Sequence, residues 1–183
     1  MTPMFMIKMW GIYGVSAKKI QGFEMKVKVS RLFSMPNLLI LYWAIYWIMN
    51  GLDKFLNRQE LGFFSWHGKD RTAQFSGYFN NTDIPLFLID PLLYLVGTWE
   101  ILIAIPLVIS LWVQVFKSSF DMAIFKFGMS CGAVTFIIFS FADVIFGDRA
   151  ELLEHGTFLI LIAVTYHLVI YQQAMKKAMM KYA

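Results

Sequence analysis

Long apolar stretches dominate the chain and alternate with short polar segments. Four of these stretches reach the length of about 20 residues that an α-helix needs to cross a bilayer. They cover residues 36–56, 91–116, 124–146 and 152–174. The pattern therefore predicts an all-α polytopic membrane protein, with four transmembrane helices packed as a bundle.

Helix-boundary residues support these limits. Pro36 suits the first turn of the first span, where a missing N–H costs nothing. Asp90-Pro91 predicts an N-cap and first helical residue for the second span, and Gly147-Asp148 predicts the end of the third.

The polar segments divide the chain into three parts. The composition of residues 1–34 predicts a basic N-terminal segment that lies on the membrane surface, with Met, Trp and Phe side chains in the interface. Residues 35–175 hold the four spans, and residues 176–183 form a basic tail. The loop 57–84 is rich in aromatic residues, which favours a folded external cap over a flexible linker.

Lysine and arginine positions predict the orientation. Basic residues concentrate before the first span, between the second and third spans, and after the fourth. The loop after the third span instead carries one basic residue against three acidic ones: Arg149, Asp148, Glu151 and Glu154. The positive-inside rule then places both termini on the cytoplasmic side of an inner or cytoplasmic membrane.

Composition agrees with a membrane location. Hydrophobic residues make up 58% of the chain and charged residues 15%, whereas soluble domains carry about 25% charged residues. The net charge of +4 is therefore interpreted as an orientation signal. No P-loop, Gly-rich nucleotide motif or basic recognition helix is present, so nucleic acid is excluded as a partner.

Four charged residues fall inside the spans or at their edges: Asp53, Lys54, Glu100 and Asp143. A charge at the centre of a membrane helix costs about 2.5–3.5 kcal/mol on insertion scales, so such residues face protein or water and have partners. They are the candidate binding residues of this chain.

Small residues predict which helix faces pack, since they let membrane helices approach closely. The relevant glycines are Gly51, Gly97, Gly128 and Gly132, the last two forming a GxxxG motif. Lys54 shares a helical face with the first of them and Glu100 with the second. Both charges should therefore point toward neighbouring helices rather than lipid.

Side-chain direction predicts that these two charges meet. Side chains lean toward the N-terminus of their own helix, and the first two spans run in opposite directions, so Lys54 and Glu100 lean toward each other. Asp53 and Asp143 should lie near the same outer rim, with Glu154 and His155. The expected result is one polar pocket near the outer face.

Three interpretations of Glu100 remain open. It forms an ion pair that only fixes helix register, or it belongs to a pocket that binds a small molecule or relays protons, or it faces another subunit.

Cysteine and histidine usage limits the cofactors. Cys131 is the single cysteine, which rules out an intrachain disulfide and dithiol exchange. The histidines are His67, His155 and His167, and the last two lie about 18 Å apart along one helix. We expect no metal site, no intrinsic cofactor and no catalytic residue within this chain.

Two short motifs carry a family resemblance: Gly51-Leu-Asp-Lys54 at the end of the first span and Gly97-Thr-Trp-Glu100 in the second. With the four spans, they make residues 36–170 resemble the DoxX-like membrane family, which includes the small membrane subunit of thiosulfate:quinone oxidoreductase. The resemblance implies a four-helix module tied to quinone, sulfur or thiol redox chemistry. It singles out the two glycines, the lysine and the glutamate of these motifs.

Three functions follow as hypotheses. The first is a subunit of a redox-linked complex with a quinone or small-molecule pocket, for which Trp47 and Trp99 offer aromatic walls beside Glu100. The second is an accessory subunit without chemistry that packs against a larger membrane enzyme. The third, an oligomeric transporter, ranks last because the two halves of the chain contain no inverted repeat. The bilayer and other membrane subunits are the expected partners.

Overall fold

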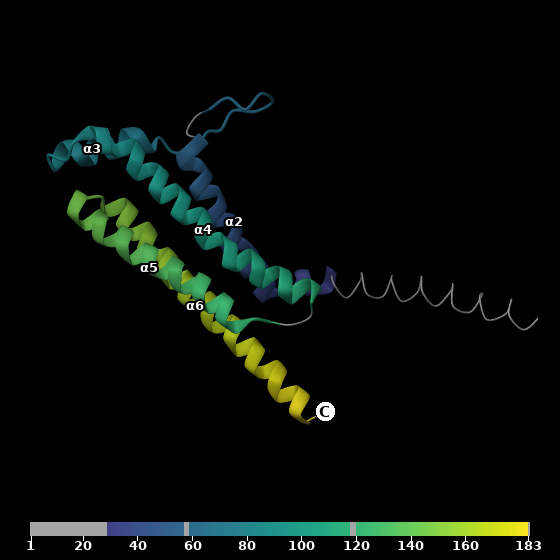
Figure 1. Cartoon of the computed structure of the whole chain (residues 1–183). Helices are drawn as coiled ribbons and strands as arrows, with labels where there is room; N and C mark the ends of the chain where they lie inside the picture. The colour runs from purple at the N-terminus through teal and green to yellow at the C-terminus, as the bar shows by residue number, and fades with distance from the viewer. Residues whose placement is uncertain (1–28, 57–58, 118–119, 183) are drawn as a thin grey trace, which may run out of the picture.

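The computed structural model describes residues 29–56, 59–117 and 120–182, and over these residues the chain is helical without strands (Figure 1). The elements are α2 (Met35–Leu56), α3 (Arg71–Asn81), the 3₁₀ turn η1 (Leu86–Leu88), α4 (Ile89–Phe116), α5 (Met122–Phe146) and α6 (Arg149–Tyr182). The surface segment predicted for residues 1–34 falls, up to residue 28, outside the described residues.

Within the described ranges, three helical stretches are long and apolar enough to cross a membrane. They are Leu86–Phe116, Met122–Phe146 and Arg149–Tyr182. The remaining long helix, α2, has 22 residues and a length of about 33 Å. It is not one of the three stretches, because Asn37, Asn50 and several tryptophans and tyrosines interrupt its aliphatic residues.

The long helices pack side by side in an antiparallel series. Helix α2 lies along α4, α5 lies along α6, and α4 and α2 also contact α5 and α6 respectively (Figure 1). Large buried side chains fill the space between them, and Trp47 packs on Phe136 with ring centroids 4.9 Å apart. The Trp43 indole N–H donates to the Thr165 hydroxyl at 3.1 Å, which satisfies the polar atom of that buried ring.

The predicted packing glycines lie at helix contacts. A Cβ atom on Gly132 would lie 3.1 Å from Trp47, and one on Gly128 would lie 2.8 Å from Leu107. Gly51 and Gly97 bring α2 and α4 together at a third contact. A larger residue at these positions would push the helices apart, as expected from the sequence.

Two helix boundaries differ from the prediction. Helix α4 begins at Ile89, with Leu88 in the capping position and no side-chain cap. The prediction of Asp90 as N-cap was therefore wrong, because η1 leads directly into the helix and places Asp90 in its first turn. At the other end of the chain, α6 continues past residue 174 to Tyr182, so residues 176–182 extend the helix.

The turn between α5 and α6 consists of two residues. Gly147 ends α5 in the left-handed conformation, with φ +76°, which glycine adopts at little cost. Asp148 then accepts the Glu151 backbone N–H at 3.0 Å and caps α6.

The aromatic loop contains a folded element. Asp70 caps α3 by accepting the Ala73 N–H at 3.0 Å. Phe79 of α3 is buried with Ile89 and Leu93 in a small apolar cluster at the start of α4. This cluster holds α3 against the start of α4.

Candidate functional site

The charges of the two glycine motifs form a buried ion pair. Lys54 Nζ lies 2.6 Å from Glu100 Oε2, and the two side chains are 6% and 3% exposed. The same ammonium group donates to the Asn50 carbonyl at 3.3 Å. The expectation that these charges meet is confirmed, and it follows from the close contact of α2 and α4 one helical turn away.

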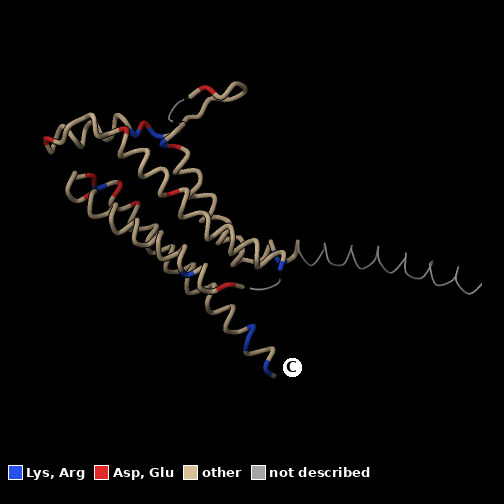
Figure 2. The backbone as a smooth tube through the Cα atoms, in the orientation of Figure 1, with Lys and Arg blue, Asp and Glu red and all other residues tan. Residues whose placement is uncertain are grey.

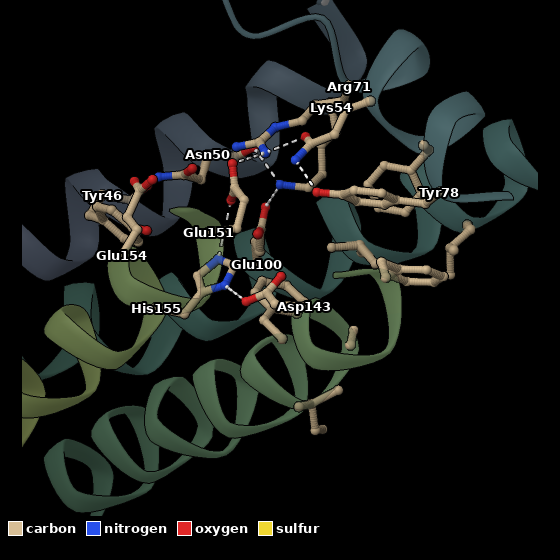
Figure 3. Close-up of a pocket in the computed structure, with 18 residues that line it drawn as sticks. Tyr46, Asn50, Lys54, Arg71, Tyr78, Glu100, Asp143, Glu151, Glu154 and His155 are labelled. Carbon is tan, nitrogen blue, oxygen red and sulfur yellow. Dashed lines mark hydrogen bonds and ion pairs between the residues drawn. The ribbon is translucent and has the colours of Figure 1, made fainter. Parts of the chain in front are cut away.

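A cavity of about 220 Å³ opens beside this ion pair (Figure 3). Its walls come from α2, α3, α4, α5 and α6, and Asp143, Glu154 and His155 line it as the sequence predicted. Its apolar part combines aliphatic side chains with aromatic rings, which include Phe75, Tyr78, Phe139 and Phe146. The Tyr78 and Phe146 rings stack with centroids 4.8 Å apart.

A chain of polar contacts crosses the cavity from α5 to α3. His155 Nδ1 lies 2.6 Å from Asp143 Oδ2, and its Nε2 lies 3.7 Å from Glu151 Oε2. The other oxygen of Glu151 contacts Lys69 and lies 3.7 Å from Arg71 Nη1. Figure 3 shows Asp143 of α5, Glu151 and His155 of α6 and Arg71 of α3 converging on the cavity.

Arg71 has a free donor in this cavity. Its Nη1 donates to Gln74 Oε1 at 2.9 Å. Its Nε atom is buried and has no hydrogen-bond partner among the described residues. An unpaired buried donor costs about 1–3 kcal/mol, so an acceptor that reached this N–H would stabilise the site.

Tyr78 fixes α3 to the turn between α5 and α6. Its hydroxyl donates to Asp148 Oδ2 at 2.5 Å and accepts from Gln74 Nε2 at 2.5 Å. Burial of the ring, followed by its hydrogen bond to Asp148, raises the pKa of Tyr78 above its ordinary value. The phenol therefore stays neutral and keeps donating across the physiological range.

Three predicted site residues lie outside the cavity. Trp47 is buried against Gly132, toward the middle of the helices. Trp99 is 43% exposed and donates to the Thr135 hydroxyl at 2.9 Å. Asp53 accepts from the Trp66 indole at 2.7 Å and from the Lys69 backbone N–H at 3.3 Å, so it ties the external loop to α2.

Helix geometry explains these differences. Trp99 and Asp53 are sequence neighbours of Glu100 and Lys54, and adjacent residues of a helix point about 100° apart. Trp47 shares the face of Lys54 but lies two turns away. The aromatic walls come instead from α3 and α5.

Two charged residues of the site were not predicted from the sequence: Arg71, and Glu151 in its cavity-lining role. Arg71 belongs to the loop 57–84, where no periodicity showed the direction of a side chain. The one available signal was Asp70 before a helical pattern, which marks a helix start and makes Arg71 its first residue.

The cavity is richer in acids than in bases. Its ionisable lining consists of the carboxylates of Glu100, Asp143, Glu151 and Glu154 against Lys54, Arg71 and His155. This balance disfavours an anionic ligand and favours a neutral or cationic one. Among the described residues, His, Cys, Asp and Glu side chains do not group in threes around a point that suits a metal ion.

Comparison of the chain with protein-family models, with curated proteins and with solved structures finds no match.

Proposed function

We propose that this chain is a four-span membrane protein, similar to the DoxX-like family, that binds a quinone or a comparable neutral molecule beside the Lys54–Glu100 pair. It would act as a non-catalytic subunit of a redox-linked complex in an inner or cytoplasmic membrane, with both termini cytoplasmic. The unpartnered Arg71 Nε in an aromatic cavity is the observation that carries this proposal.

The assignment of four spans rests on α2. Three helical stretches already meet the requirements for crossing a membrane. Helix α2 has the necessary length and packs along α4 through the Gly51–Gly97 contact. Its indoles are largely turned into the protein, where Trp43 and Trp47 are each 1% exposed, so its lower apolarity does not prevent it from crossing beside α4.

A quinone head group fits the lining. Pockets for drug-sized ligands measure about 300–1,000 Å³, so a cavity of about 220 Å³ suits one ring rather than a large ligand. The aromatic side chains offer ring faces, and the unpaired Arg71 N–H would donate to a quinone carbonyl oxygen that reached it. The excess of carboxylates argues against an anion such as thiosulfate as the ligand in this cavity.

The test is binding of decylubiquinone to the purified protein in detergent, followed by quenching of tryptophan fluorescence. Arg71→Lys keeps the charge and removes the Nε donor, so we expect about a tenfold loss of affinity. Arg149→Lys makes the same change at an exposed position outside the cavity and should bind like the wild type. Equal affinity of wild type and Arg71→Lys would refute the proposed contact.

Glu100→Gln gives a second test. This change removes the negative charge that pairs with Lys54 and should reduce quinone binding, because the freed ammonium reorganises the cavity wall. Glu60→Gln, in the loop outside the cavity, is the matched control. Wild-type binding by folded Glu100→Gln would place the quinone elsewhere.

A purely structural role in a larger complex is the second candidate. It is favoured by the low burial of the last helix, of whose most apolar segment only 17% is covered within this chain. Lipid or another subunit must cover the remainder. Extraction in mild detergent distinguishes a subunit of a larger complex from a chain surrounded by lipid alone. Co-purifying chains support the complex, and a stable lone chain argues against it.

A further inference from the structure

A second cavity lies at the opposite end of the helices from the Lys54–Glu100 pair. It measures about 680 Å³ and opens between the start of α2, the end of α4 and the end of α6. Its lining shares no residue with the first cavity. The two sites are therefore separate.

Unpaired amide groups gather in this second cavity. The buried atoms without a hydrogen-bond partner among the described residues include Asn37 Oδ1, Gln114 Oε1, Gln172 Oε1 and Gln173 Nε2, and all four residues line the cavity. Asn37 is 1% exposed and Gln114 7% exposed. Because burying a polar atom without a partner is costly, an occupant that supplies hydrogen-bond donors to the amide oxygens is expected.

The same cavity is positively charged. Its lining includes Arg31, Lys176 and Lys177, and no acidic residue belongs to the described lining. Figure 2 shows lysine on the far end of α6, while most acidic residues lie toward the opposite end of the helices. The occupant should therefore carry negative charge as well as hydrogen-bond donors.

We propose that this cavity binds the head group of an anionic glycerophospholipid whose head group also bears hydroxyl groups, such as phosphatidylglycerol. The phosphate would contact Lys176, Lys177 and Arg31, and the hydroxyl groups would donate to the amide oxygens of Gln114 and Gln172. Basic pockets at the ends of membrane helices are suited to anionic lipid head groups. Phe120, Met179 and Met180 add an apolar edge for the start of the acyl chains.

The position of the cavity supports a lipid as the occupant. It lies at the ends of α4 and α6, both of which are long and apolar enough to cross a membrane. The N-terminal segment of the chain itself is a poor match in charge, since residues 1–28 contain five lysines and one glutamate. The inference goes beyond the proposed function and depends only on the membrane placement of these two helices.

The experiment measures lipid binding to the full-length protein by native mass spectrometry, with lipids of identical acyl chains. Phosphatidylglycerol supplies both features, phosphatidic acid lacks the head-group hydroxyls, phosphatidylethanolamine is zwitterionic, and phosphatidylcholine lacks N–H and O–H donors. We expect phosphatidylglycerol to bind most tightly and phosphatidylcholine least. Soluble glycerol 3-phosphate should not displace the lipid at equal concentration.

Two variants separate the charge from the amide contacts. Lys176→Ala with Lys177→Ala should weaken phosphatidylglycerol binding about thirtyfold, at about 1 kcal/mol for each lysine. Lys126→Ala with Lys181→Ala removes the same charge from residues that do not line the cavity, and should bind like the wild type. Gln114→Leu should lower the preference for phosphatidylglycerol over phosphatidic acid by about fivefold.

Defined outcomes would overturn the proposal. Equal binding of all four lipids would show that the cavity does not select a head group. Unchanged binding by the Lys176/Lys177 variant would show that the two lysines do not contact the phosphate. Equal binding of phosphatidic acid and phosphatidylglycerol to the wild type would show that the amide oxygens do not contact the head-group hydroxyls. Displacement by glycerol 3-phosphate would replace the lipid with a soluble phosphate. None of these results bears on quinone binding at the other end.

Discussion

Gly51 and Gly97 hold α2 and α4 so close that a Cβ atom on Gly51 would lie 2.7 Å from the Gly97 carbonyl oxygen. Lys54 and Glu100 each follow their glycine by three residues, on the same helical face. The close approach of the two backbones therefore brings the ammonium and carboxylate groups within 2.6 Å. Backbone contact and ion pair form one structural unit.

The first prediction concerns this backbone contact. Gly51→Ala places a methyl group against Ile101 and the Gly97 carbonyl, so α2 must shift and the free energy of unfolding should fall by about 1–3 kcal/mol. Denaturant unfolding in detergent, followed by tryptophan fluorescence, measures the change. Gly77→Ala in α3 meets no neighbouring atom within 4 Å and should leave stability unchanged or slightly increased. Equal stability of both variants would contradict the tight contact.

The second prediction concerns the buried ion pair. Lys54→Met leaves Glu100 buried without its partner and should cost about 3–5 kcal/mol of unfolding free energy. Adding Glu100→Gln to that variant removes the stranded charge and should restore part of the loss. The control is Lys69→Met, since Lys69 is 48% exposed and such a pair is worth about 0–1 kcal/mol. A double variant less stable than Lys54→Met would show that the two charges do not depend on each other.

The third prediction concerns Tyr78 and alkaline pH. Its pKa is raised in the folded protein by burial and by its hydrogen bond to Asp148, whereas the unfolded chain has the ordinary value of about 10. The contribution of Tyr78 is therefore complete below about pH 10 and falls as the pH rises above it. The difference in unfolding free energy between wild type and Tyr78→Phe should be constant from pH 8 to 9.5 and shrink by pH 11.

Tyr182→Phe, at the exposed end of α6, controls for the loss of a phenol group. Its stability should follow the wild type at every pH. A wild-type difference from Tyr78→Phe that stays constant to pH 11 would mean that the phenol gives up its proton as readily in the folded as in the unfolded chain.

The fourth prediction tests the membrane crossing of α2. In a Cys131→Ala background, single cysteines at Ser30, Asn80 and Lys181 report which face each position occupies through labelling by an impermeant maleimide. If α2 crosses, Ser30 and Lys181 label from one face and Asn80 labels from the other. Labelling of Ser30 on the same face as Asn80 would leave three spans and contradict the four-span proposal.

The main helices and the central ion pair were accessible from sequence, because both depend on local regularities. Apolar length located α4, α5 and α6, and helical periodicity placed Lys54 and Glu100 on the faces that carry Gly51 and Gly97. The aromatic wall was not accessible in this way. Tyr78 and Phe75 belong to α3, within the loop 57–84. The position of α3 depends on the Tyr78–Asp148 hydrogen bond, a contact between residues 70 positions apart.

The second cavity illustrates a different limit. Asn37 and Gln114 interrupt apolar segments and are visible in the sequence, but a lone amide in a membrane helix commonly bonds across to a neighbour. The structure shows that both amide oxygens lack a hydrogen-bond partner among the described residues and that both residues line the same cavity. This depends on how the ends of α2, α4 and α6 are arranged.

The two-residue turn at Gly147 and Asp148 has a consequence for biogenesis. So short a connection cannot trail across a bilayer, and its caps tie the end of α5 to the beginning of α6. In the proposed four-span topology, these two helices would therefore insert as a hairpin, with the turn on the outer side. The insertion machinery would then insert α5 and α6 as one unit rather than one helix at a time.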